Sequence, residues 1–216
     1  MAKRLELNGL ECYLLPQRAF YIAKYQMLLV SDWHLGKLKH FRAEGLFVPA
    51  PAIQEELARL DAILNEIPVK QVVFLGDLFH SKLNSDWHLF CQYLQGKTGI
   101  SFSLTVGNHD ILNDEDWHRA GLKLTDHILL PEGVLLSHEP KAGLDGHLIN
   151  IVGHVHPGCV IQTAGRQTFR LPCFHFHKQL LTLPAFGKYT GLHIFPAHQE
   201  ARIFAVVDQS ILELPA

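Results

Sequence analysis

The sequence predicts one α/β domain in which a mixed sandwich of sheets takes its helices mostly from the first half of the chain. Three observations support this class. Buried apolar runs in "MLLV", "QVVFLGDLFHS" and "SFSLTV" each lead into polar residues, and amphipathic helical patterns lie between them. From about residue 127 the chain changes to short strands separated by Gly and Pro turns. A chain of 216 residues is long enough for one sizeable core, so we expect a single domain over residues 1–216.

The elements of the first half follow from local patterns. Residues 5–15 form a hairpin, because an Asn-Gly turn joins two mostly apolar arms. Residues 27–30 are too few for a helix and form a buried strand. Residues 51–67 place Ile and Leu three and four positions apart, which predicts an amphipathic helix. A second helix covers 86–95, with Ser85 as its expected N-cap.

The second half reads as short strands. The segments that predict them are "HILLPEGVLLSH", "LINIVGHVH", "GCVIQT", "QTFRL", "QLLTLPAF" and "RIFAVV".

Composition and net charge do not decide what kind of molecule this protein binds. The formal charge is −2, which gives neither a basic surplus for nucleic acid nor an acidic tail. The four cysteines form no CxxC pair, so neither a zinc knuckle nor a disulfide framework is expected. No apolar run approaches the roughly 18 residues of a membrane span, and a cytoplasmic location is the expectation. The outlying number is 15 histidines, since histidine is the commonest metal ligand in proteins.

Five loops at strand ends carry candidate metal ligands and no thiolate. They are Asp32 and His34 in "SDWHLG", Asp77 in "GDLFH", Asn108 with His109 and Asp110 in "GNHD", His138 in "SHEP", and His154 with His156 in "GHVH". In an extended strand residues i and i+2 point the same way, so each D-x-H or H-x-H pair is expected to converge on one side. Because five loops coincide, metal ligation is favoured over unrelated polar turns. The further pair His175 and His177 has no partner loops and is interpreted as a strand face.

These motifs resemble those of the calcineurin-like metallophosphoesterases. Within that superfamily the strings "SDWHLGK", "GDLFHS", "SHEP", "GHVHPG" and "LPAFGKYTG" are most similar to the DNA ligase-associated metallophosphoesterases. The resemblance extends from about residue 28 to 191, and it implies a four-layer α/β/β/α sandwich of mixed sheets. Trp33 and Leu192 depart from the residues expected at their positions, which affects substrate fit rather than chemistry.

The resemblance implies a site of two divalent metal ions. One ion would be held by Asp32, His34 and His156, the other by Asn108, His138 and His154, with Asp77 bridging them. Such ions neutralise a phosphodiester and lower the pKa of a shared water. Oxygen and imidazole ligands favour Mn, with Fe, Mg and Zn left open.

The resemblance also implies roles around the metals. His109 would protonate the leaving alkoxide or stabilise charge in the transition state, and Asp110 would orient its ring. Lys37, His40 and Arg42 are candidate phosphate contacts, with a solvated surface as the alternative. His80 is either a substrate contact or a hydrogen-bond donor to the side chains that would bind the metals.

The function expected from this resemblance is a phosphodiesterase, and specifically a DNA or RNA nuclease or endonuclease that acts in DNA repair beside a DNA ligase and a helicase. A single-stranded substrate or an end would fit the weak net charge. The alternative is a small-molecule phosphoesterase or pyrophosphatase that acts on nucleotides or sugar diphosphates. A non-catalytic scaffold is disfavoured by the full ligand set. The sequence does not decide the substrate, the metal, the cleavage polarity or the oligomeric state.

Overall fold

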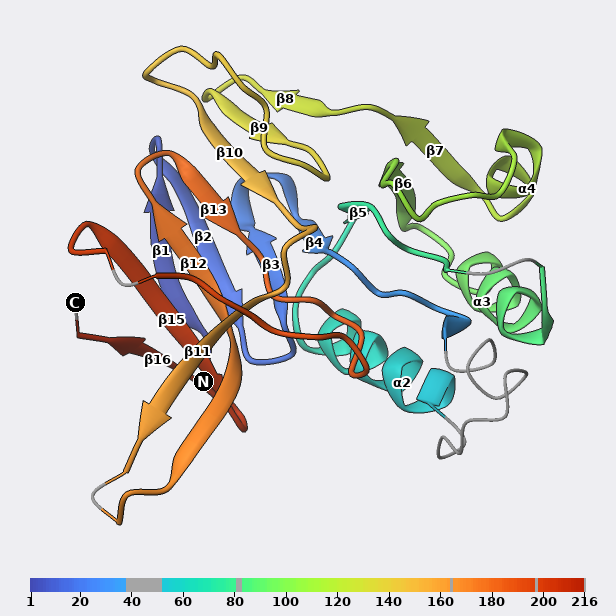
Figure 1. Ribbon diagram of the computed structural model, residues 1–216. Helices are drawn as coiled ribbons and strands as arrows, with labels where there is room; N and C mark the ends of the chain where they lie inside the picture. The colour runs from blue at the N-terminus through green and yellow to red at the C-terminus, as the bar shows by residue number, and fades with distance from the viewer. Residues whose placement is uncertain (38–51, 81–82, 164, 197, 216) are drawn as a thin grey trace.

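Two mixed sheets face each other, and helices cover the outer face of the first (Figure 1). The computed structural model describes residues 1–37, 52–80, 83–163, 165–196 and 198–215. Its elements are labelled as in Figure 1.

The first sheet has seven strands in chain order. They are β1 (Lys3–Leu7), β2 (Leu10–Leu15), β3 (Ala19–Ile22), β4 (Met27–Val30), β5 (Gln71–Phe74), β6 (Ser101–Thr105) and β7 (Leu122–Thr125). Strands β1 to β4 form an antiparallel meander, and β4 to β7 are parallel. The register pairs Val30 with Phe74 and Phe74 with Leu104. The carboxyl ends of β4, β5 and β6 therefore lie at one edge, where ligand loops of α/β sheets collect.

In the described residues, three α-helices connect the parallel strands β4 to β7; they are α2 (Ala52–Glu66), α3 (Ser85–Gln95) and α4 (Asp114–Arg119). The short 3-10 helix η1 (Ala23–Tyr25) lies between the antiparallel strands β3 and β4. The expectation that Ser85 caps α3 is wrong. Asn84 is the N-cap, because its side-chain oxygen accepts from the backbone N–H of Asp86 at 2.8 Å and of Trp87 at 3.3 Å.

The second sheet has nine strands. They are β8 (Ile128–Leu130), β9 (Val134–Leu136), β10 (Ile149–Val152), β11 (Pro157–Gln162), β12 (Thr168–His177), β13 (Leu180–Thr182), β14 (His193–Ile194), β15 (Ala201–Val207) and β16 (Ser210–Leu214). The main order is β14-β11-β12-β13-β10-β9-β8, and β15 pairs with both β12 and β16. The hairpin of β11 and β12 extends beyond the rest of the sheet as an arm (Figure 1).

Two apolar cores separate the layers, and β4 contributes to both. Leu28 and Val30 pack with the helices in one core, whereas Met27 and Leu29 pack between the two sheets. All four residues of β4 are buried, as expected for a parallel strand covered on both faces.

The mixed two-sheet α/β fold is confirmed, with one difference from the four-layer expectation. Among the described residues, α2, α3 and α4 all pack on the first sheet, so the layers observed are α/β/β. The elements β3, α4, β7, β14 and β16 were not expected from the sequence; each has only two to six residues, too few for a periodic pattern. None of the helices in the described residues is long and apolar enough to cross a membrane.

Candidate metal centre

The loops after β4 and β5 run side by side and carry three candidate ligands. The N–H of His34 donates to the carbonyl of Asp77 at 2.9 Å, and the N–H of Leu35 donates to the carbonyl of Leu78 at 2.9 Å. The N–H of Asp32 donates to the carbonyl of Gly76 at 3.2 Å. These bonds continue the parallel pairing beyond the strands and hold the two loops in fixed register.

The ligand loops have left-handed backbone rather than extended backbone. The φ angles are +50° at Asp32, +51° at His34, +49° at Asp77, +69° at His154 and +53° at His156. The backbone is therefore not extended, and strand alternation does not describe these pairs: Asp32 and His34 lie in one group of candidate ligands, whereas His154 and His156 lie in different groups. Non-glycine residues rarely adopt this conformation, and they keep it where the surrounding structure enforces it, typically at functional sites.

Glycines in the motifs make room for ligands from neighbouring loops. A Cβ on Gly153 would lie 2.4 Å from a carboxylate oxygen of Asp32, and one on Gly76 would lie 2.2 Å from Nδ1 of His138. Real Cβ atoms do not approach so closely. The "GD" and "GH" dipeptides thus reflect contact between loops that are far apart in sequence.

Asp32, His34 and His156 form what we call the buried group. Nε2 of His34 lies 3.1 Å from Nε2 of His156, which lies 3.5 Å from Oδ1 of Asp32. Asp32 is fully buried, and its carboxylate accepts the backbone N–H of His154. Burial lowers the pKa of His34 to about 2, with the nearby His156 adding to the effect. The ring is therefore neutral and can offer a lone pair to a cation.

Asp77, His138 and His154, together with Asn108, form what we call the open group. Oδ1 of Asn108 lies 3.1 Å from Nε2 of His138 and 3.1 Å from Nδ1 of His154. Nδ1 of His138 contacts the carbonyl of Leu75 at 3.0 Å, which fixes a proton on Nδ1 and leaves Nε2 free as a ligand. Asn108 and His154 are exposed, so this group faces solvent.

The Asp77 carboxylate lies between the two groups. Its Oδ2 is 3.8 Å from Nε2 of His34 in the buried group, and its Oδ1 is 3.4 Å from Nε2 of His138 in the open group. Each oxygen faces a different group, which is the placement that a bridging carboxylate needs.

The donor atoms fit divalent metal ions. Nitrogen ligands about 2.1 Å from one ion and at right angles to each other lie about 3.0 Å apart. The two separations between ring nitrogens, His34 to His156 and His138 to His154, are both 3.1 Å. Each group also brings three ligand atoms within 4.8 Å of one another.

His109 lies at the centre, but Asp110 does not orient it. The His109 ring packs 4.2 Å from the ring of His80 and 5.7 Å from that of His34, and the backbone N–H of His109 donates to Oδ1 of Asp77. Asp110 instead accepts backbone N–H groups of Leu78, Phe79 and Gly107. The expected orienting role is therefore wrong, because the carboxylate is already used to tie the loops of Asp77 and Asn108 together. Burial raises the pKa of Asp110 to about 6.

The calcineurin-like phosphoesterase profile matches residues 25–190, which is most of the chain and includes every ligand described above. This chain belongs to the calcineurin-like phosphoesterase family. The crystal structure of Pseudomonas putida nuclease MPE is similar, with a TM-score of 0.82 and 28% sequence identity, over 99% of this chain and 100% of that one. A protein of unknown function, AQ665 from Aquifex aeolicus, has a TM-score of 0.41 and 21% identity over 60% of this chain and 78% of that one. No curated protein matches the sequence.

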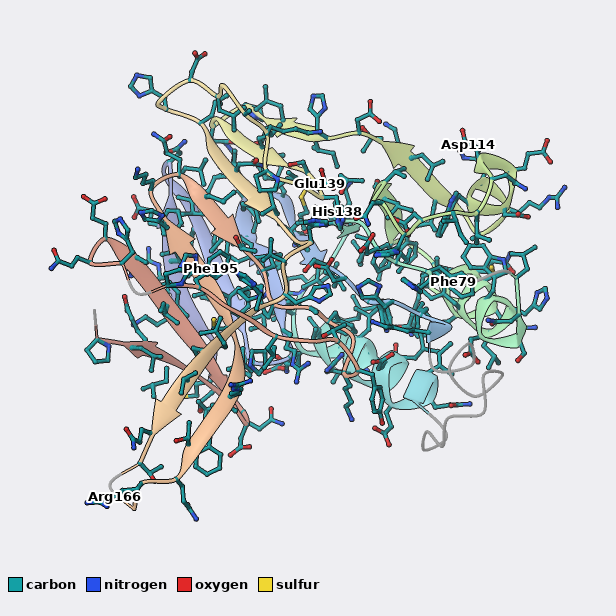
Figure 2. All side chains as sticks on the ribbon, viewed as in Figure 1. Phe79, Asp114, His138, Glu139, Arg166 and Phe195 are labelled. Carbon is teal, nitrogen blue, oxygen red and sulfur yellow. The ribbon has the colours of Figure 1, made fainter. Side chains whose placement is uncertain are left out.

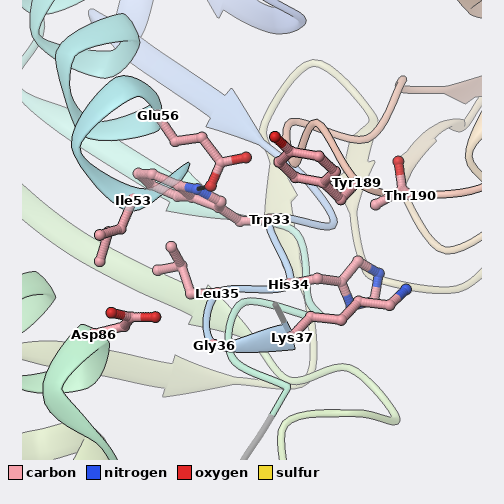
Figure 3. A pocket seen from close by; sticks show the side chains of 10 residues that line it. All are labelled: Trp33, His34, Leu35, Gly36, Lys37, Ile53, Glu56, Asp86, Tyr189 and Thr190. Atoms are coloured by element: carbon pink, nitrogen blue, oxygen red, sulfur yellow. Dashed lines mark hydrogen bonds between the residues drawn. The ribbon is translucent and has the colours of Figure 1, made fainter. Parts of the chain in front are cut away.

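The remaining candidate contacts of this phosphoesterase are only partly placed. His80 lies beside the centre, with its ring 5.3 Å from that of His34. Lys37 lines a pocket together with His34, Tyr189 and Thr190 (Figure 3). His40 and Arg42 lie outside the described residues.

Trp33 does not face the ligands, although it lies between two of them in sequence. Its indole packs on Phe90 and Phe186 in the helical core, and Nε1 donates to Oε2 of the buried Glu56 at 2.9 Å (Figure 3). The unexpected tryptophan is therefore a core residue.

Sequence reasoning missed Glu139. Its Oε1 lies 3.8 Å from Nδ1 of His154, at the solvent side of the open group, and Figure 2 shows it beside His138. The signal available was its place directly after a ligand in "SHEP". The pair His175 and His177 is on β12, and neither belongs to the two groups of the centre.

Proposed function

We propose that this phosphoesterase is a two-metal phosphodiesterase that cleaves nucleic acid. The observation that carries the proposal is the convergence of seven candidate ligands into two adjacent groups with the Asp77 carboxylate between them. Two divalent cations bound there would supply charge neutralisation of the phosphate and an activated water as nucleophile.

The two groups would divide the work of holding the ions. The buried group would hold one ion and the open group, with Asn108 as its neutral oxygen ligand, the other. Asp77 would bridge. The mixture of imidazole and oxygen ligands without thiolate suits Mn, and Fe, Mg and Zn fit the same donors less specifically.

His109 is proposed as the group that assists the leaving oxygen. It is exposed, next to the ligand Asn108, and its backbone N–H is held by Asp77. The ring is therefore positioned by the ligand loops without being needed as a ligand. From there it can donate a proton to an alkoxide or stabilise negative charge on the phosphate.

The distribution of charge supports a polyanionic substrate. Residues 146–199 contain no Asp or Glu and four Lys or Arg, whereas the remaining residues contain all 21 acidic and 15 of the 19 basic residues. A chain with net charge −2 thus includes a segment of +4 that carries His154, His156 and the β11–β12 arm. Arg166, at the end of the arm, and Arg170 are exposed and form no ion pair within the described residues (Figure 2). Such a basic segment attracts phosphates.

The finer parts of the proposal rest on similarity. The similar Pseudomonas putida protein is a nuclease, which supports nuclease activity here. Endonuclease action on a single strand or an end, a role in DNA repair with a ligase and a helicase, and a cytoplasmic location follow from the motif resemblance alone.

A substrate panel tests the proposal. Protein stripped with chelator and reloaded with Mn would be incubated with single-stranded DNA, circular duplex DNA, RNA, nucleotides and an aryl phosphodiester. We expect hydrolysis of the aryl ester and of at least one nucleic acid, and none in excess chelator. Hydrolysis of nucleotides or sugar diphosphates without nucleic acid cleavage would favour the small-molecule alternative. Inactivity on every substrate would refute both.

A further inference from the structure

We propose a third cation site, separate from the metal centre, formed by His177, His198 and Glu200 on the outer face of the second sheet. One ring nitrogen of each histidine and one carboxylate oxygen of Glu200 lie within 4.8 Å of one another. The same geometric relation holds within each group of the metal centre, and this cluster shares no residue with either.

The site is anchored on regular structure. His177 is the last residue of β12, and its register partner on β15 is Ala201, the residue directly after Glu200. The N–H of Ala201 donates to the carbonyl of His198 at 3.0 Å, which closes a turn. Backbone pairing therefore brings the three donors together, although 20 residues separate His177 from His198 in sequence.

The donors point to the outer face of the sheet, away from the inter-sheet core. Phe174 and Phe176 on β12 pack in that core, so the alternating His175 and His177 face outward. Here the strand alternation expected for the H-x-H pair holds. The outer face is covered by residues that follow β14: Phe195 stacks on His175 at 4.1 Å between ring centroids, and the His198 ring lies 4.1 Å from that of His177.

An orphaned donor atom points to a ligand. Nε2 of His177 is inaccessible to solvent and has no hydrogen-bond partner in the described residues. A polar atom in that position normally finds a partner, and a cation held with His198 and Glu200 supplies one. Two imidazoles and one carboxylate, with water in the remaining position, are typical of Zn²⁺ and of related divalent transition metals.

Binding requires a local adjustment of His198. Its Nδ1 now accepts the backbone N–H of Glu200 at 3.2 Å, and a neutral imidazole has one in-plane lone pair. A cation on this ring replaces that contact. The His177 and His198 planes are inclined by 47°, compared with 84° and 86° for the histidine pairs of the metal centre, so the exposed His198 ring must also rotate.

A cation at this site would fix the chain that covers the outer face of the sheet to strand β12. The chain between β13 and β15 carries β14, where the N–H of His193 donates to the carbonyl of His156 at 2.9 Å. A cation that joins His198 and Glu200 to β12 would hold this covering segment in place, and through it the backbone of a ligand in the buried group.

Metal stoichiometry tests the site. Chelator-stripped protein would be saturated with Zn²⁺, desalted and analysed for bound metal, and thermal stability would be recorded with and without Zn²⁺. We expect three equivalents in the wild type, two in His177→Ala and in His198→Ala, and three in His147→Ala. His147 is a matched control, since it is exposed and its ring forms no hydrogen bond or ion pair in the described residues.

The failure of this site is distinguishable from failure of the metal centre. Two equivalents in the wild type, or unchanged stoichiometry in both His177→Ala and His198→Ala, would overturn the third site. One equivalent that is lost in His177→Ala but kept in Asp77→Asn would support it and contradict the metal centre instead. His198 is exposed, so its alanine variant tests the site even where His177→Ala fails to fold.

Discussion

The buried group and the open group use similar donors in different surroundings. In the buried group the side chains of Asp32, His34 and His156 are 0%, 4% and 17% exposed. In the open group His154 is 39% exposed and has the carboxylate of Glu139 beside it. If each group holds an ion as proposed, the ion in the buried group would be shielded from water and exchange, while the ion in the open group would be able to contact a substrate.

The two groups also differ in how they are held. The Asp32 carboxylate accepts the backbone N–H of His154 and is packed against Gly153, whereas the His154 side chain extends toward solvent. Asp77 lies between the groups. A change at Asp77 is therefore expected to weaken metal binding most, a change within one group less, and a change at the solvent-exposed edge of a group least.

The largest effect is expected for Asp77→Asn, because the Asp77 carboxylate faces both groups. The amide keeps the shape of the side chain but loses the negative charge that faces both groups, so both ions should be released. Phosphodiester hydrolysis should then fall by more than the roughly 10- to 100-fold typical of residues that hydrogen-bond to metal ligands. Elemental analysis and the rate on an aryl phosphodiester measure this. Two retained ions with a near-normal rate would exclude a bridging role.

His109→Ala should slow hydrolysis without disturbing either group. Cleavage of a nucleic acid strand is expected to fall by about 10²- to 10⁴-fold, since a poor alkoxide leaving group needs the proton. An aryl ester should be affected less, because it leaves readily as an anion. Metal content is the control, and loss of an ion would make His109 a ligand. Equal slowing of both substrates would assign it to charge stabilisation on the phosphate.

Gly153→Ala should damage the buried group more than the open group. The new Cβ would meet the Asp32 carboxylate at 2.4 Å, so Asp32 must move and its ion should bind about 10- to 100-fold more weakly. The matched control is Gly165→Ala, where a Cβ meets only the Thr163 hydroxyl at 3.9 Å. Metal titration of both variants, with circular dichroism as a folding check, measures the effect. Equal weakening of both ions would show that the groups are not independent.

The smallest effect is expected for Glu139→Gln, at the rim of the open group. Its carboxylate is 54% exposed and 3.8 Å from His154, so it should strengthen ion binding there by at most about fivefold. The buried group should not respond. Glu115→Gln on α4, 83% exposed, is a control for the change in net charge. A selective change larger than tenfold would make Glu139 a direct ligand.

Much of the fold was predictable from local patterns. The strand Met27–Val30, the hairpin of β1 and β2 and the helix α2 follow from runs and periods that each segment carries by itself. The cap of α3 was misplaced by one residue because Asn84 and Ser85 are both good caps, and only the backbone conformation decides between them. The second helical layer was expected from resemblance alone, whereas the described residues cover that face with the chain after β14.

The sequence by itself determined which residues are candidate metal ligands, because oxygen and imidazole donors placed at five strand ends have few other uses. It did not determine how they converge. Left-handed backbone at His34 and His154, and the contact between Gly153 and Asp32, arise between loops up to about 120 residues apart, which no local pattern encodes. The tertiary structure also decided that Asp110 ties loops together and that His177 meets His198, because both depend on which backbone groups lie opposite each side chain.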